Sequence, residues 1–188
     1  FMNILSAQFI GSYTEISTCP TPTLPEYAFI GRSNVGKSSL INMLTNKVGL
    51  AKISNTPGKT RTINYFLINN KWYLVDLPGY GFAKISYSVR TKWESLIKNY
   101  LSKRENLQCV FLLIDARLSP QKSDILFANW LGEVGVPFVL VFTKTDKQGK
   151  LKTLLNVDRF KKELLKHWEQ LPQSFITSAK TKMGREDV

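Results

Sequence analysis

The sequence contains few cysteines, a single histidine and no long hydrophobic run. Its two cysteines, Cys19 and Cys109, lie far apart, and Cys109 opens an apolar run, so we interpret it as a buried reduced thiol and expect a cytoplasmic protein. The one histidine, His167, lies in a lysine-rich stretch, which favours a surface role over catalysis. No apolar run approaches the roughly 20 residues that span a bilayer, and no basic-then-apolar signal pattern opens the sequence. We therefore expect neither export nor stable membrane insertion.

Acidic residues are also scarce. The 188 residues include 14 Asp and Glu against 26 Lys and Arg, which gives a net charge of +12. This excess indicates a polyanionic partner, either nucleic acid or an anionic membrane surface, or a solvated basic surface that only aids solubility. Composition does not choose among these. Hydrophobic and charged contents of 43% and 21% are globular values, and the length suits one domain with a real core.

One eight-residue stretch fits the phosphate-loop pattern G-x-x-x-x-G-K-[ST]. An apolar run of strand length precedes it at 27–30, and residues 39–44 continue with apolar side chains on one helical face. Strand, glycine loop and helix form the context that a phosphate cradle requires, because backbone N–H groups and the helix start face the ligand. We expect Lys37 to reach the β- and γ-phosphates and Ser38 to hold Mg²⁺. The loop comprises Gly31, Arg32, Ser33, Asn34, Val35, Gly36, Lys37 and Ser38.

Two further segments are expected near the phosphates. Residues 47–61 show no sustained period, and a long loop directly after a phosphate loop is predicted to fold over the nucleotide. Strands at 62–68 and 71–76 are predicted to form a hairpin through Asn69 and Asn70. The second strand ends in a segment that is expected to coordinate Mg²⁺ through water. A glycine in the same segment is expected to bring its N–H close to the γ-phosphate. That segment is Asp76, Leu77, Pro78 and Gly79.

The rest of the chain predicts a single α/β domain. Apolar runs at 110–114 and 136–142 are typical of central parallel strands, with a crossover helix at about 121–134. Asn156 is expected to cap a later helix. We predict an N-terminal strand or arm and proline-rich connector at 1–25. A nucleotide-binding domain then spans 26–188, with a mostly parallel sheet, one antiparallel strand and helices on both faces. Its final helix, opening at 184–187, is expected to be cut short.

The loop after the second apolar run indicates the base. Asp146 can accept hydrogen bonds from guanine N1–H and the 2-amino group together, whereas adenine offers an acceptor at N1 and no 2-amino group. Lys144 would lie along the base plane. The sequence therefore predicts a GTP site rather than an ATP site. The loop comprises Thr143, Lys144, Thr145 and Asp146.

Together these motifs resemble the translation-factor class of P-loop GTPases. From about residue 3 onward the chain resembles the YihA/EngB/YsxC family, through G-R-S-N-V-G-K-S-S-L-I-N, T-P-G-K-T-R-T-I-N, D-L-P-G-Y-G-F-A and T-K-T-D. The sequence W-E-x-L-I-x-x-Y-L at 93–101 favours that family over Era, EngA and MnmE. The resemblance implies a Ras-like G domain. It also implies that Thr60 binds Mg²⁺ within a first switch formed by Gly58, Lys59, Thr60, Arg61 and Thr62. A base-contacting loop would present backbone N–H groups to guanine O6 from Thr177, Ser178 and Ala179.

Two positions depart from the wider class. Thr143 stands where many GTPases have Asn, and Tyr80 follows Gly79 where Ras-like enzymes have the glutamine that orients the attacking water. We therefore expect slow basal hydrolysis. Asn34 matches a position that helps hold K⁺ in relatives such as MnmE, or it fixes the loop through a side-chain-to-backbone hydrogen bond. Arg32 is a competing cation. The catalytic candidates are Lys37, Thr60 and Asn34.

The resemblance further implies a role for GTP hydrolysis in assembly of the large ribosomal subunit, with defective cell division and septation on loss of function. The partners would be GTP or GDP and large-subunit particles, through rRNA or ribosomal proteins, and we expect a monomer. The alternative is a membrane- or septum-associated GTPase that does not act on ribosomes. A metabolite kinase is disfavoured, since no acceptor site or lid is recognisable. Candidate RNA contacts are Arg90, Lys92, Lys98, Lys103, Lys161, Lys162 and Lys166.

Overall fold

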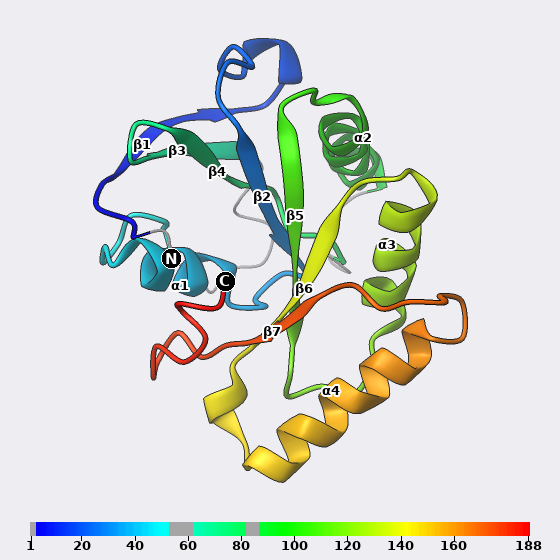
Figure 1. The fold of residues 1–188 in the computed structure, drawn as a ribbon. Helices are drawn as coiled ribbons and strands as arrows, with labels where there is room; N and C mark the ends of the chain where they lie inside the picture. The colour runs from blue at the N-terminus through cyan, green and yellow to red at the C-terminus, as the bar shows by residue number, and fades with distance from the viewer. Residues whose placement is uncertain (1–2, 53–61, 82–86) are drawn as a thin grey trace.

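The computed structural model describes residues 3–52, 62–81 and 87–188 (Figure 1). Its strands form one seven-stranded sheet in the order β1-β3-β4-β2-β5-β6-β7. The strands are β1 (Ala7–Tyr13), β2 (Glu26–Gly31), β3 (Ile63–Ile68), β4 (Trp72–Asp76), β5 (Leu107–Asp115), β6 (Phe138–Thr143) and β7 (Ser174–Ile176). The helices are α1 (Lys37–Thr45), α2 (Tyr87–Lys103), α3 (Lys122–Glu133) and α4 (Lys150–Leu164), with short 3-10 helices η1 (Ile16–Thr18) and η2 (Thr145–Lys147).

Within this sheet β3 runs against both of its neighbours. It pairs antiparallel with β1 and with β4, whereas β2, β4, β5, β6 and β7 pair in parallel. Asn69 and Asn70 join β3 to β4 with φ angles of 51° and 53°, the left-handed conformation that the sequence predicts for a tight hairpin. The predicted mostly parallel sheet with one antiparallel strand is confirmed.

Alternate residues of the central strands point to opposite faces and enter two separate cores. In β5, Val110, Leu112 and Ile114 pack into the core that α2, α3 and α4 cover, whereas Leu113 packs into the core beneath α1. Figure 1 shows α1 on one side of the sheet and α2 and α3 on the other. Because both faces are covered, the central strands are apolar without interruption. Helices lie on both faces, as predicted.

Helix α4 begins earlier than the sequence predicts. Its first residue is Lys150 and its N-cap residue is Gly149, so the prediction that Asn156 caps this helix is wrong. Asn156 lies inside the helix and is buried, and its Nδ2 donates to the Ala116 carbonyl at 3.0 Å. The amide therefore anchors α4 to the loop that follows β5.

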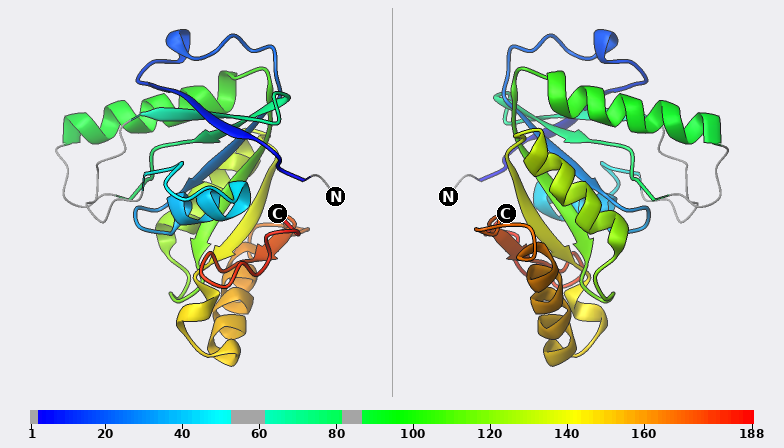
Figure 2. Two further views of the ribbon diagram at one scale, coloured as in Figure 1. Left: turned by 90° about the vertical axis from the view of Figure 1, so that its left-hand side faces the viewer. Right: turned by 90° about the vertical axis from the view of Figure 1, so that its right-hand side faces the viewer.

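The two ends of the molecule carry different elements. Figure 2 shows α2 at one end and α4 with the C-terminal segment at the other.

Residues 184–187 form a turn, in which the Val188 N–H donates to the Gly184 carbonyl at 3.3 Å. Among the helices that the structure describes, none is both long and apolar enough to cross a membrane.

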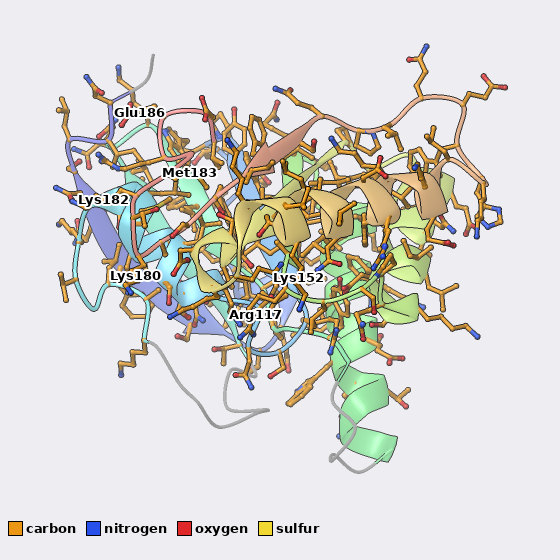
Figure 3. All side chains as sticks on the ribbon, turned by 90° about the horizontal axis from the view of Figure 1, so that it is seen from below. Arg117, Lys152, Lys180, Lys182, Met183 and Glu186 are labelled. Atoms are coloured by element: carbon orange, nitrogen blue, oxygen red, sulfur yellow. The ribbon has the colours of Figure 1, made fainter. Side chains whose placement is uncertain are left out.

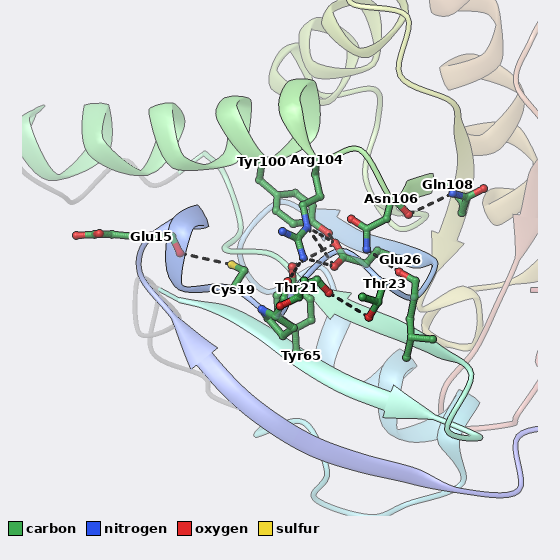
Figure 4. Close-up of polar contacts among 12 residues, drawn as sticks. Glu15, Cys19, Thr21, Thr23, Glu26, Tyr65, Tyr100, Arg104, Asn106 and Gln108 are labelled. Atoms are coloured by element: carbon green, nitrogen blue, oxygen red, sulfur yellow. Dashed lines mark hydrogen bonds and ion pairs between the residues drawn. The ribbon is translucent and has the colours of Figure 1, made fainter.

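A buried carboxylate holds the α2 end together (Figure 4). Glu26 opens β2 and is fully buried, and its Oε2 accepts hydrogen bonds from the hydroxyls of Tyr65 at 3.2 Å and Tyr100 at 2.5 Å. Arg104 completes the site with an ion pair of 2.7 Å and also donates to the Pro20 carbonyl. Every part of the carboxylate is thus compensated, and the proline-rich connector is fixed to the body of the domain.

Candidate nucleotide-binding site

Three predicted motifs meet at one edge of the sheet. The phosphate loop follows β2, the Asp76 segment closes β4, and the loop containing Asp146 follows β6. These strands run in the same direction, so their carboxyl ends lie at the same edge, where open α/β sheets bind ligands.

The phosphate loop has the backbone conformation of an anion cradle. Asn34 and Gly36 adopt positive φ angles of 61° and 102°, and α1 begins directly afterwards at Lys37. A Cβ on Gly36 would lie 3.4 Å from the Lys144 Cε, so the loop and Lys144 are closely packed. The N-terminal end of α1 therefore faces the cradle with its free N–H groups and positive dipole end.

The end of β4 is joined to the start of the phosphate loop. The Tyr80 N–H donates to the Gly31 carbonyl at 3.2 Å, and the Ser33 N–H donates to the Tyr80 carbonyl at 3.2 Å. Gly79 lies between these bonds, where a Cβ would come within 3.1 Å of the Gly31 oxygen. Any larger residue would require these backbone atoms to shift by a few tenths of an ångström, so glycine suits the close approach of the two segments.

Asp76 and Lys37 form an ion pair at the base of the cradle. Both side chains are nearly buried, and the Lys37 ammonium donates to Asp76 Oδ1. Asn64 on β3 lies 3.4 Å from the other carboxylate oxygen. The two predicted phosphate and magnesium residues are thus neighbours in the structure, together with Ser38 in the first turn of α1.

Thr143 links the phosphate loop to the loop after β6. Its hydroxyl lies 2.6 Å from the Val35 carbonyl and 3.2 Å from the Ile114 carbonyl. The side chain that replaces the usual asparagine is therefore buried among backbone oxygens. Its role is to join two loops of the site.

Lys144 spans the same two loops from the other side. Its backbone is left-handed, with a φ of 59°, and its ammonium donates to the Asn34 carbonyl and to Asp115 Oδ2, the latter at 3.0 Å. Arg117 donates to both oxygens of Asp115 at 2.9 and 2.7 Å. Burial alone would raise the pKa of Asp115, but the hydrogen bonds from Arg117 and Lys144 outweigh it and hold the pKa below its ordinary value.

Asp146 is oriented by the loop after β7. Ser178 Oγ donates to Asp146 Oδ1 at 2.7 Å, and this hydrogen bond lowers the pKa of the carboxyl group. The lowered pKa favours the ionised carboxylate, which is the form that the predicted guanine contact requires. The carboxylate faces a cavity of about 550 Å³ whose walls include Gly36, Thr143, Lys144, Asp146, Thr177 and Ala179.

The predicted backbone donors for guanine O6 are not equivalent. The Thr177 N–H donates to the Phe142 carbonyl at 2.7 Å, and the Ser178 N–H donates to the Met183 carbonyl at 3.1 Å. In the part of the chain that the structure describes, the Ala179 N–H has no hydrogen-bond partner. The predicted hydrogen bond to guanine O6 therefore depends on the Ala179 N–H.

Tyr80 is held on α3 by a residue that the sequence did not single out. Its hydroxyl donates to Asp124 Oδ1 at 2.9 Å, and its ring stacks on Phe127 with centroids 4.5 Å apart. Asp124 is only 3% exposed. This burial raises the pKa of Asp124 to about 6, although the Tyr80 hydrogen bond and the charge of Arg32 act to lower it.

Part of the predicted site lies outside the described residues, namely Gly58, Lys59, Thr60 and Arg61. Thr62 is described, and its hydroxyl lies 3.0 Å from Asn64 Oδ1. Within the described ranges no group of three His, Cys, Asp or Glu side chains is arranged to hold a metal ion.

The parallel sheet, phosphate loop and guanine loop together define a GTP-hydrolysing G domain of the P-loop class. Residues 26–144 match the family model described as 50S ribosome-binding GTPase. The "Probable GTP-binding protein EngB" of Bacteroides fragilis is 54% identical over 189 residues, covering 100% of this chain and 93% of that protein. The protein of the same name from Christiangramia forsetii is 52% identical, covering 100% of this chain and 94% of its own length. The chain belongs to the EngB family of GTP-binding proteins, as its sequence motifs predict.

Solved structures agree with this assignment. A structure titled "Crystal structure of a probable GTP-binding protein engB" has a TM-score of 0.66 at 25% identity, over 86% of this chain and 93% of that one. The FeoB G-domain from Methanococcus jannaschii has a TM-score of 0.58 at 26% identity, over 87% of this chain and 91% of that one.

Proposed function

We propose that this GTPase acts as a nucleotide-dependent switch on large ribosomal subunit particles during their assembly. The observation that carries the proposal is the family match over 26–144, whose description names 50S ribosome binding. The net charge of +12 supports a partner rich in phosphate. We further propose that the protein works in the cytoplasm as a monomer, and that its loss leads to defects in cell division and septation.

Magnesium is proposed to accompany the nucleotide. Mg²⁺ takes oxygen ligands and keeps several waters, so a hydroxyl and one carboxylate beside a phosphate cradle suit it. The Ser38 hydroxyl would hold the ion directly and Asp76 would hold it through water, with Thr60 as the proposed second hydroxyl ligand. When bound, the ion neutralises charge on the β- and γ-phosphates. Lys37 binds the same phosphates, and the tight contact between the Gly79 segment and the phosphate loop orients the Gly79 N–H.

Hydrolysis is proposed to be slow without a partner. The side chain at the glutamine position is Tyr80, which donates to Asp124 and stacks on Phe127. A tyrosine held on α3 in this way does not orient an attacking water. The missing electrostatic help therefore has to come from the partner or from a bound cation.

Potassium is the proposed cation. Asn34 has a left-handed backbone at the tip of the phosphate loop and an exposed side chain, so its amide oxygen is accessible to an ion beside the phosphates. GTPase rates at matched ionic strength in KCl and NaCl test this. Faster turnover in KCl that Asn34→Ala abolishes is the expected result, and equal rates with saturating particles present would contradict it.

Nucleotide-dependent sedimentation tests the main proposal. Purified large-subunit particles are pelleted with the protein saturated by GDP or by a non-hydrolysable GTP analogue, and co-sedimentation that depends on the nucleotide is expected. Lys37→Ala, which impairs nucleotide binding, serves as the control and should lose this dependence. Pelleting with anionic membrane vesicles but not with particles would favour a membrane- or septum-associated GTPase instead.

A further inference from the structure

Five exposed lysines surround the guanine end of the site. They come from three segments: η2, the first turn of α4, and the loop after β7. In the described part of the chain none of their ammonium groups has a carboxylate within ion-pair distance. Figure 3, which views the molecule from below, places Lys152, Lys180 and Lys182 on one face together with Arg117. We call these residues the guanine-side lysines: Lys147, Lys150, Lys152, Lys180 and Lys182.

The lysines that the sequence suggested as RNA contacts at the end of α4 and directly after it differ from this group. Lys162 pairs with Asp158 at 2.9 Å, and Lys166 pairs with Glu163 at 2.7 Å. Such exposed pairs contribute little to stability, yet each places a negative charge beside the positive one. The C-terminal end of α4 and the residues directly after it are therefore less attractive to a polyanion than the N-terminal end of the helix.

Carboxylates close to the guanine-side lysines are few. Asp146 lies in the cavity that takes the guanine, and its charge is used there. Asp187 lines the neighbouring cavity of about 840 Å³ together with Lys150. Glu186 is a third carboxylate near this group, and its charge is paired with Arg185 at 3.6 Å. The five lysines therefore outnumber the three carboxylates near them.

We propose that the guanine-side lysines bind the phosphate backbone of RNA, and that the bound RNA covers the mouth of the nucleotide pocket. The inference rests on the proposed ribosomal function and names the surface that would carry it. Charge complementarity identifies the ligand as a phosphodiester chain. Since Lys147, Lys180 and Lys182 line the guanine cavity itself, a strand that crosses them lies over the path by which the base leaves.

The shape of this surface favours a flexible strand over a membrane. Three of the lysines line the cavity of about 550 Å³ and Lys150 lines the neighbouring one of about 840 Å³, so the group does not form a flat plane. A phosphodiester chain can follow the rims of both cavities, whereas a lipid surface would reach only the outermost ammonium groups. Exposed Leu151 and Met183, at 73% and 46%, offer apolar contacts to unpaired bases between the phosphates.

The consequence is a regulatory one. RNA that covers the pocket mouth slows the release of GDP, so the protein keeps its nucleotide while it stays on the particle. Leaving the particle then precedes nucleotide exchange. A partner that acts as an exchange factor would produce the opposite order, because nucleotide exchange would then take place on the particle.

Three neutralised variants, each saturated with nucleotide, test the surface by sedimentation with large-subunit particles. The first is Lys147→Gln with Lys180→Gln and Lys182→Gln, the second is Lys150→Gln with Lys152→Gln, and the control is Lys161→Gln with Lys162→Gln and Lys166→Gln. Each lost phosphate contact lowers the salt slope of the affinity by about 0.7–0.9. The first variant should lose at least tenfold in affinity and the second severalfold, while the control stays close to wild type.

The outcomes separate this inference from the proposed function. If wild type binds particles but the first variant binds equally well, or the control loses as much as the first variant, the guanine-side surface is wrong and the ribosomal function stands. If wild type binds no particles and pellets with phosphatidylglycerol vesicles, both fail. Release of fluorescent GDP from wild type should become at least threefold slower with saturating particles, and an unchanged or faster rate would overturn the covering of the pocket.

Discussion

The Lys144 ammonium lies 3.0 Å from the Asp115 carboxylate, although Asp115 ends β5 and Lys144 directly follows β6. The same ammonium donates to the Asn34 carbonyl, so one side chain joins the guanine loop to the phosphate loop. In the predicted binding mode, GTP and GDP contact both loops at once. Asp115 touches no predicted nucleotide atom, yet it sets where the two halves of the site stand relative to each other.

Asp115→Asn should therefore weaken GTP and GDP binding by similar factors. The amide keeps an acceptor for Lys144 but loses the charge. Charge-assisted hydrogen bonds are stronger than neutral ones by about 1 kcal/mol, which corresponds to roughly a fivefold loss of affinity. Calorimetric titration with both nucleotides measures the loss. Arg117→Ala leaves the contact between Lys144 and Asp115 in place, so it should reduce nucleotide affinity less. An equal loss of affinity in the two variants would show that the stability of the loop after β5, and not the Lys144 contact, is responsible.

Guanine specificity should depend on Asp146. Asp146→Asn is expected to weaken GTP and GDP binding more than tenfold, since each charge-assisted hydrogen bond is worth about 1.5–3 kcal/mol. The amide can donate to the 2-oxo group of xanthine, so the variant should gain xanthine-nucleotide binding. Competition between GTP and XTP measures the exchange of preference. Binding of ATP by the wild type would contradict the assignment of the base.

Lys37 and Thr60 should differ in which nucleotide they affect. Lys37→Ala should impair GDP and GTP binding alike, because the ammonium meets the β-phosphate of both. Thr60→Ala should spare GDP and weaken only GTP, because its proposed switch segment is ordered by the γ-phosphate and Mg²⁺. Affinities measured with GDP and a non-hydrolysable GTP analogue test this. A Thr60 variant that loses both equally would rule out the switch assignment.

The buried Asp124 should make stability depend on pH near 6. Its pKa is about 6 in the folded protein, against an ordinary value of 3.8. The folded state therefore binds the proton more tightly, so this group's contribution to stability falls as the pH rises from about 4 through 6. Asp124→Asn should remove that loss and stabilise the protein above pH 7 by up to roughly 3 kcal/mol, with no gain near pH 4.

Denaturant unfolding at pH 4.5 and 8 measures the effect. Asp158→Asn changes an exposed carboxylate of α4 and is the matched control, with no pH-dependent gap expected. A gap of the same size in both variants would mean that overall charge, and not the burial of Asp124, governs the pH dependence.

The sequence predicts the parts of the site that follow local motifs. The phosphate loop, the Asp76 segment and the Asp146 loop each carry their chemistry within a few consecutive residues, and parallel strand order brings them together. Thr143 was recognised as a departure, but its contacts were not predicted, because the Val35 carbonyl that it meets lies 108 positions away. Contacts of that separation leave no periodic trace in one sequence.

The same limit explains what was missed. Asp124 is an ordinary acidic residue in the first turn of a helix, a position that acidic residues favour for the helix dipole alone. Its partner Tyr80 lies 44 positions earlier. The start of α4 was misplaced for another reason: Leu151, Leu154 and Leu155 are exposed, so its first turns lack an apolar face directed at the core.

The buried Glu26 cluster has a consequence for how the chain folds. Its partners Tyr65, Tyr100 and Arg104 lie 39, 74 and 78 positions away in the sequence. A buried carboxylate without its partners costs about 3–5 kcal/mol, so β2 is stable in the sheet only after β3 and α2 have docked. This end of the domain therefore assembles and opens as one cooperative unit, and the backbone amides of its strands and helix should exchange with solvent together.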